Sequence, residues 1–226
     1  MGGGFSLKKV IFQVFLVAMA WFSFVAVSCA ESMRAEVTEE FLDLGAVEAS
    51  CPVVQVDDAS VSEKINCAIK QEIDDFTQSV RLASLQQPRL HGTVSYDVTC
   101  NKAYTFSCVL TETVFDKNDA EVESFAKGFI FKLATGNKVT YNDIWELAAE
   151  AGNTNRYDRK GLTWQLNRQL DRAGVAVLPT LRYAPYPPQN LYMDQKFRCH
   201  VIYQPGAVAH KSAGIVDVDI DEIDEG

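Results

Sequence analysis

Histidine is scarce in this sequence, and no two cysteines stand at the short spacing that metal and redox sites use. The 226 residues include three histidines, His91, His200 and His210, and none of the six cysteines forms a Cys-x-x-Cys motif. Zinc sites and thioredoxin-like sites need such clusters. Phosphate-binding loops, the paired-histidine zinc motif and the nucleophile elbow are also absent. The sequence therefore predicts a protein that is not an enzyme and holds no metal and no other cofactor.

Basic residues are in the minority. The chain has 21 Lys and Arg against 30 Asp and Glu, which gives a formal charge of −9. Nucleic acids and anionic lipid surfaces are poor partners for such a chain, whereas a cationic protein is attracted to it. The composition therefore excludes nucleic acid as the expected partner and favours a positively charged one.

Long apolar runs are missing after the first thirty residues. An apolar run at 10–27 follows two lysines, and small residues stand at 28–30. We interpret 1–30 as a secretory signal peptide, which predicts an exported protein, periplasmic or extracellular, with no membrane span after cleavage. Two alternatives stay open, namely lipidation of Cys29 and an uncleaved anchor at 10–27.

The remaining chain predicts an α+β fold of two small subdomains, each a mostly antiparallel sheet with one main packed helix. Residues 31–45 are polar and weakly periodic, and we interpret them as a tether or a fraying first element. A charged connector at 116–123 marks the boundary between an N-terminal subdomain, 46–120, and a C-terminal subdomain, 121–222. Residues 223–226 form an acidic tail.

The N-terminal subdomain has the clearest periodic signals. Residues 46–56 alternate as a strand does, and a helix of about twenty residues begins at the capping box of Ser60 and Glu63. Its apolar stripe is Val61, Ile65, Ile69, Ile73, Phe76 and Val80. Two runs, 94–100 and 104–110, predict a β-hairpin.

The C-terminal subdomain begins with a strand at 126–133 and a short helix that ends at 150. A second helix at 153–173 carries Leu162, Leu166 and Leu170 at a spacing of four. A proline-rich loop and two strands, 197–203 and 214–220, complete the chain. Aspartates 217, 219 and 221 alternate with apolar residues, which predicts a strand with one wet face rather than a calcium loop.

Five cysteines remain after the leader, and their wide spacing favours structural use in an oxidising compartment. A regular hairpin holds Cys100 and Cys108 too far apart for a bridge. Cys51 and Cys67 are the preferred disulfide candidate, because the strand that carries Cys51 precedes the helix that carries Cys67. Such a bridge would stabilise the folded state by about 3 kcal/mol.

The last strands carry a family resemblance. A short strand ending in an aromatic and Asp194 precedes Tyr203-Gln-Pro205, a turn of small residues and Ala213-Gly-Ile-Val-Asp-Val218. This pattern resembles the extracellular module shared by the lysozyme-sensing anti-sigma factor RsiV and by PdaC-type peptidoglycan deacetylases. The resemblance covers most of the chain from Cys51 to Ile220. It implies an α+β envelope module rather than an enzyme core, and we expect neither the deacetylase's catalytic module nor the sigma-binding segment.

These observations predict an exported, non-catalytic envelope binding module, with a cationic lysozyme-like protein or a peptidoglycan fragment as its partner. Tyr183 and Tyr186, on the stiff proline-rich loop, and Tyr192 just beyond it are the candidate ligand-binding residues. One alternative is an envelope hydrolase that uses carboxylates with His200 or His210. Another is a structural lipoprotein acylated at Cys29.

Overall fold

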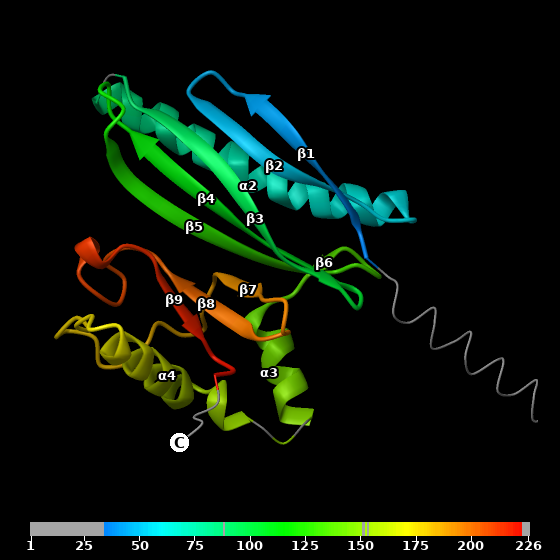
Figure 1. The fold of residues 1–226 in the computed structure, drawn as a ribbon, viewed down its shortest axis with the longest axis vertical. Helices are drawn as coiled ribbons and strands as arrows, with labels where there is room; N and C mark the ends of the chain where they lie inside the picture. Colours follow the sequence, from blue (N-terminus) through cyan, green and yellow to red (C-terminus); the bar gives the residue numbers. More distant parts are fainter. Residues whose placement is uncertain (1–33, 88, 151, 153, 223–226) are drawn as a thin grey trace, which may run out of the picture.

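The computed structural model describes residues 34–87, 89–150, 152 and 154–222. The predicted signal peptide at 1–30, with the alternative acylation site Cys29, and the acidic tail at 223–226 lie outside these residues. Two sheets form the described body, one of six strands and one of three, and helices pack on both (Figure 1). The predicted α+β class with two sheet subdomains is therefore confirmed. None of the described helices is long and apolar enough to cross a bilayer.

The large sheet has the strand order β1-β2-β3-β4-β5-β6. All neighbours are antiparallel except β2 and β3, which pair in parallel over a short stretch. A parallel pair needs a crossover connection, and helix α2 supplies it. The elements are β1 (Glu36–Asp43), β2 (Val47–Gln55), α2 (Ala59–Gln86), β3 (His91–Lys102), β4 (Thr105–Phe115), β5 (Glu121–Lys132) and β6 (Asn137–Lys138).

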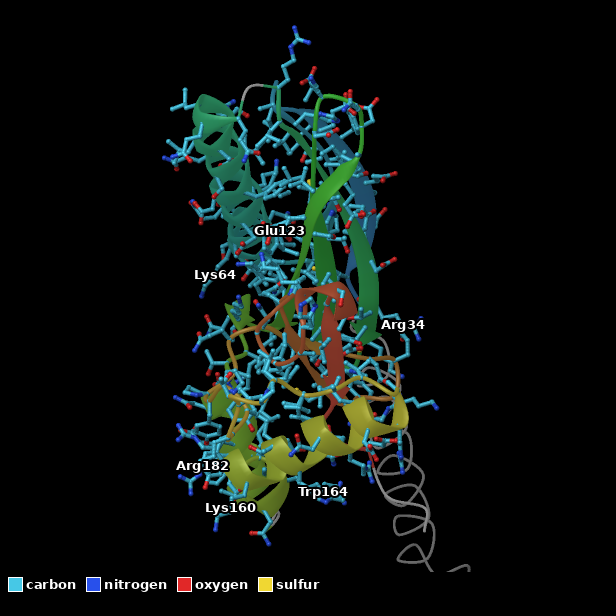
Figure 2. All side chains as sticks on the ribbon, turned by 90° about the vertical axis from the view of Figure 1, so that its left-hand side faces the viewer. Arg34, Lys64, Glu123, Lys160, Trp164 and Arg182 are labelled. Carbon is cyan, nitrogen blue, oxygen red and sulfur yellow. The ribbon has the colours of Figure 1, made fainter. Side chains whose placement is uncertain are left out.

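Helix α2 covers only one face of the large sheet (Figures 1 and 2). Asp58 caps its N-terminus, because Oδ1 accepts a hydrogen bond of 2.9 Å from the amide of Ser60. The predicted apolar stripe is confirmed, since all six of its residues are buried. Gly92 of β3 permits this packing, because a Cβ there would lie 2.9 Å from the ring of Phe76.

The small sheet has the antiparallel order β7-β8-β9. Helices α3 and α4 pack on one face, where the predicted leucines 162, 166 and 170 meet Val201 and Val218 in a second core. Asp158 caps α4 by accepting a hydrogen bond of 2.7 Å from the amide of Gly161. The elements are α3 (Tyr141–Glu150), η1 (Thr154–Arg156), α4 (Arg159–Arg172), β7 (Leu191–Met193), β8 (Cys199–Tyr203), η2 (Lys211–Ala213) and β9 (Val216–Asp219).

The prediction of a polar tether at 31–45 is wrong, because residues 36–43 form strand β1. The strand pairs with β2 along its whole length, from Glu36 opposite Gln55 to Asp43 opposite Glu48. Its sequence looks polar because β1 is an edge strand with one face turned to solvent, so few of its side chains need to be apolar.

The predicted boundary in the connector 116–123 is also wrong. The connector is a hairpin turn in which Oδ1 of Asp116 accepts hydrogen bonds from the amides of Asn118 (2.7 Å) and Ala120 (3.0 Å). Strand β5 therefore pairs with β4 in the large sheet instead of beginning the small one. The chain leaves the large sheet only after β6.

The two sheets meet closely where β7 crosses one end of the large sheet. Gly128 of β5 lies against β7, because a Cβ there would stand 2.3 Å from the carbonyl oxygen of Leu191. The amide of Met193 donates to Oγ of Ser107 (2.9 Å), which lies on β4. The small sheet thus covers one end of the face that α2 leaves open.

Candidate binding surfaces

The rest of that open face carries exposed side chains of β1, β2 and β3. Val47, Ala49 and Cys51 of β2 point toward α2 in the core. Side chains alternate along a strand, so the intervening residues of β2 point outward, and so do the residues of β1 that pair with those intervening residues. We name the exposed outward residues the acidic face: Glu39, Phe41, Asp43, Glu48, Ser95 and Asp97.

The charges on the acidic face are all negative. Strands β1, β2 and β4 contain no Lys and no Arg. On the opposite side of β1, Glu40 pairs with Lys70 of α2 at 2.8 Å. Among the described residues no cation pairs with the four acids of the acidic face, and Glu39 is instead bonded by the hydroxyl of Ser50. The face therefore presents an uncompensated negative field.

The centre of this surface is a ladder of small hydroxyl side chains. Thr93 stands opposite Thr113 and Ser95 opposite Thr111, and the hydroxyls of Thr113 and Ser124 lie 3.2 Å apart. Phe41 lies among these polar side chains, and 66% of its surface is exposed. An exposed aromatic among short polar groups and carboxylates suits contact with another protein.

A second cluster lies on the outer side of the small sheet. Nδ1 of His200 stands 3.1 Å from Oδ1 of Asp217 and 3.0 Å from the hydroxyl of Tyr192, which donates to Oδ2 of Asp217 at 2.5 Å. Nε2 of His200 is buried and lies 3.7 Å from Asp194. Arg198 joins Asp194 (2.7 Å) to Asp219 (2.6 Å).

This cluster favours the charged form of His200. Burial alone would lower the pKa of His200, but the hydrogen bond to Asp217 and the charges of Asp217, Asp219 and Asp194 outweigh burial and raise it. His210 takes no part, since its Nδ1 contacts Ser212 in a turn. Among the described residues no group of His, Cys, Asp and Glu side chains is arranged to hold a metal ion.

The three candidate tyrosines have separate surroundings. Tyr183 is 42% exposed beside Arg182, whereas Tyr186 packs edge-on against Tyr141 with 5.7 Å between ring centres. Tyr192 stacks on His200 at 4.5 Å and its hydroxyl is engaged in the cluster described above. No ring contact or hydrogen bond joins any two of the three. Of the three, only Tyr183 has the exposed ring that was expected from its place on the proline-rich loop.

The candidate disulfide between Cys51 and Cys67 is not formed. Both thiols are free, and Cys51 is buried in the core while Cys67 is exposed. The stripe of α2 faces the sheet, so Cys67, on the other side of the helix, points to solvent and away from Cys51. Burial raises the pKa of the Cys51 thiol, and it raises the pKa of Cys108 to about 12, as expected for inert structural cysteines.

Sequence reasoning missed two exposed aromatic residues, Phe41 and Trp164. Phe41 lies in the segment that was predicted as a tether. Trp164 lies on α4, two positions after Leu162 and therefore outside the leucine stripe. A large aromatic outside the apolar stripe of an amphipathic helix is the signal that would have marked Trp164.

No protein-family model matches the sequence, and no curated protein matches it either. The solved structures that are similar to this chain include two proteins of the DUF3298 family, a domain of unknown function. The first, from Bacteroides fragilis, has 10% identity and a TM-score of 0.46, and the match covers 84% of this chain and 90% of that one. The second, from Pseudomonas aeruginosa, has 10% identity and a TM-score of 0.48, with 82% and 88% covered.

Proposed function

We propose that this protein is an exported, non-catalytic binding module of the cell envelope that engages a cationic protein through the acidic face. The observation that carries the proposal is an open sheet surface with four exposed carboxylates and an exposed Phe41. Strands β1 and β2 contain no Lys or Arg, and the one lysine of β3, Lys102, donates to the carbonyl oxygen of Gln195 instead of pairing with these acids. Complementary charge would speed association with a basic partner, and Phe41 would supply the buried contact that such interfaces need. The signal peptide predicted at 1–30 supports export.

The resemblance of the last strands to the lysozyme-sensing module supports a lysozyme-like hydrolase as the partner. The test is a calorimetric titration with lysozyme at about 50 mM and about 200 mM salt, because screening weakens contacts between exposed charges. We expect binding that weakens at the higher salt. The double variant Glu48→Lys with Asp97→Lys should weaken binding about tenfold or more at low salt.

A matched control separates the acidic face from net charge. Glu63→Lys with Asp74→Lys makes the same charge change on exposed positions of α2, behind the sheet. We expect this control to change the affinity by about twofold at most. Equal losses in the two double variants, or no binding of lysozyme at either salt concentration, would contradict the proposal.

An envelope hydrolase is the second candidate, because His200 and Asp217 lie within hydrogen-bond reach, as a general base and its partner do. Against it, His200 is only 9% exposed and both its nitrogens face side chains of the same cluster. Release of soluble fragments from peptidoglycan that is lost in His200→Ala would favour the hydrolase. The third candidate, a structural lipoprotein, requires acylation of Cys29, which mass spectrometry of the mature chain detects.

A further inference from the structure

Trp164 lies on the solvent side of α4, and the core does not require it there. The stripe of Leu162, Leu166 and Leu170 is buried against the small sheet, while 51% of Trp164 is exposed. Figure 2 shows Trp164 and Lys160 at the same end of the molecule, on α4 and far from the tip of the large sheet. Exposing a tryptophan forgoes its large burial energy, so its position points to contact with something outside the chain.

Two surface cavities meet at this tryptophan. One, of about 570 Å³, is bordered by Asn155, Arg156, Lys160, Trp164 and Glu222, and the other, of about 460 Å³, is bordered by Trp164, Asn167, Arg168 and Asp171. The first is formed because Gly161 lets η1 approach α4, since a Cβ at Gly161 would lie 2.1 Å from the carbonyl oxygen of Asn155. Arg168 lies 4.5 Å from the indole centre and holds the ring by a cation–π contact.

The charge around Trp164 is the reverse of the charge of the whole chain. Residues 156–182 contain six Arg and Lys and two Asp, in a protein whose net charge is −9. Arg168 and Arg172 both reach Glu222, at 2.7 Å each. No described side chain forms an ion pair with Arg156 or Lys160, which border the larger cavity. Glu222 also borders this cavity, but its carboxylate is paired with the two arginines. The cavity therefore offers cations, a neutral amide and an aromatic ring beside a carboxylate that is already paired.

We propose that the cavities at Trp164 bind a carboxylated saccharide. The indole would lie against the apolar face of a sugar ring, the amide of Asn155 would bond its hydroxyl or acetamido groups, and Lys160 and Arg156 would hold its carboxylate. In the envelope this chemistry is that of a muramyl sugar, whose lactyl ether carries the carboxylate. The site is separate from the acidic face and does not depend on the cationic partner proposed above.

The test compares a sugar that carries the carboxylate with two neutral sugars that lack it. Tryptophan fluorescence and the indole N–H resonance of Trp164 are followed during titration of the protein with N-acetylmuramic acid, its methyl ester and N-acetylglucosamine. We expect N-acetylmuramic acid to bind about tenfold more tightly than either neutral sugar, because only it can pair with Lys160 and Arg156. Equal binding of the three, or no response from Trp164, would overturn the proposal.

Three variants locate the site. Trp164→Ala should reduce the affinity for N-acetylmuramic acid about tenfold or more, and Lys160→Gln should reduce it about threefold to tenfold. Tyr183→Ala is the control, since Tyr183 is an exposed aromatic on the neighbouring proline-rich loop. Both aromatic side chains are exposed, so their removal leaves the core intact. Loss of binding in Tyr183→Ala with retention in Trp164→Ala would overturn the assignment, and none of these outcomes alters the lysozyme titration.

Discussion

The two ends of the molecule present opposite chemistry. The acidic face is a flat sheet surface on strands β1 to β4, where hydroxyl groups lie between unpaired carboxylates. The surface around Trp164 is a hollowed helix surface where cations and an indole meet. The formal charge of −9 has the sign of the acidic face but not that of the surface around Trp164. A partner must therefore be inferred from each surface separately, and the two surfaces suit ligands of opposite charge.

The molecule has two halves, the large sheet with α2 and the small sheet with α3 and α4, and their interiors differ as well. Under α2 the carboxyl of Glu112 is 3% exposed, and its Oε1 has no hydrogen-bond partner among the described residues. In the small sheet, by contrast, His200 is held among Asp217, Asp194 and Tyr192. Burial without a partner favours the neutral form of an acid, whereas surrounding carboxylates favour the charged form of a histidine. Glu112 in the large-sheet half and His200 in the small-sheet half are thus both buried, and opposite effects of their surroundings set their charge.

The largest expected effect comes from breaking the contact between the halves. Gly128→Ala would place a Cβ about 2.3 Å from a backbone oxygen of β7, so one sheet must shift away from the other. We expect a loss of about 3 kcal/mol or more in the free energy of unfolding, measured by urea denaturation. Gly45→Ala is the control: its φ is +79° but nothing lies within 4 Å, and it should cost about 1 to 2 kcal/mol. Equal losses would mean that the junction is not tightly packed.

The next effect concerns Glu112. Burial raises its pKa from 4.5 to about 7, with a further increase from the charge of Glu72, while Lys127 opposes the change. A raised carboxyl pKa means that the folded state binds a proton that the unfolded state has released, so stability falls as pH rises from 4.5 to about 7. Glu112→Gln should remove that loss and stabilise the protein at about pH 8 by up to about 3 kcal/mol.

Urea denaturation of Glu112→Gln at about pH 5 and about pH 8 checks this prediction. The gain should appear at the higher pH and be small at the lower one. The exposed Glu48→Gln should change stability by about 0.5 kcal/mol at most at either pH. The same gain at both pH values would show that protonation of Glu112 is not the cause.

The smallest of these effects concerns His200. Because the pKa of His200 is raised, its contribution to stability is fully present below the unfolded value of 6.5 and is lost as pH rises through the folded value. Asp217→Asn removes the partner at 3.1 Å, so it should lower the pKa of His200 and cost about 1 to 3 kcal/mol at about pH 6. The imidazole resonances of His200 measured against pH report the change, and those of His210 are the control. An unchanged titration of His200 would contradict the structural role assigned to Asp217.

The sequence predicted those elements whose pattern is strong. The stripe of α2 and the leucines of α4 repeat at three and four residues because each helix buries one face. The hairpin of β3 and β4 was also predicted, although β3 extends beyond the predicted 94–100 at both ends and β4 continues to Phe115 instead of ending at 110. Burial of one face leaves a regular pattern in the sequence, and this explains why these elements were found.

The surfaces could not be predicted in the same way. Strand β1 is polar because half of it faces solvent, so no apolar alternation marked it. The larger cavity at Trp164 is formed where η1 packs closely on α4 at Gly161, and no periodic pattern in the sequence marks that contact. Tyr186 and Tyr192 were predicted as ligand-binding residues because they lie in or beside a stiff loop. Their contacts with Tyr141 and His200 arise only in the folded chain, so the sequence could not show them.

The central claim is that the acidic face, and not the surface around Trp164, binds the cationic partner. Its most direct test is a map of backbone amide shifts in the isotope-labelled protein during titration with lysozyme. If the account is correct, shifts concentrate on Phe41, Ser50, Ser95 and Thr111, which share the outer side of the large sheet, while Trp164 and its helix stay unchanged. Shifts concentrated on α4, or spread evenly over every acidic segment of the protein, would contradict it.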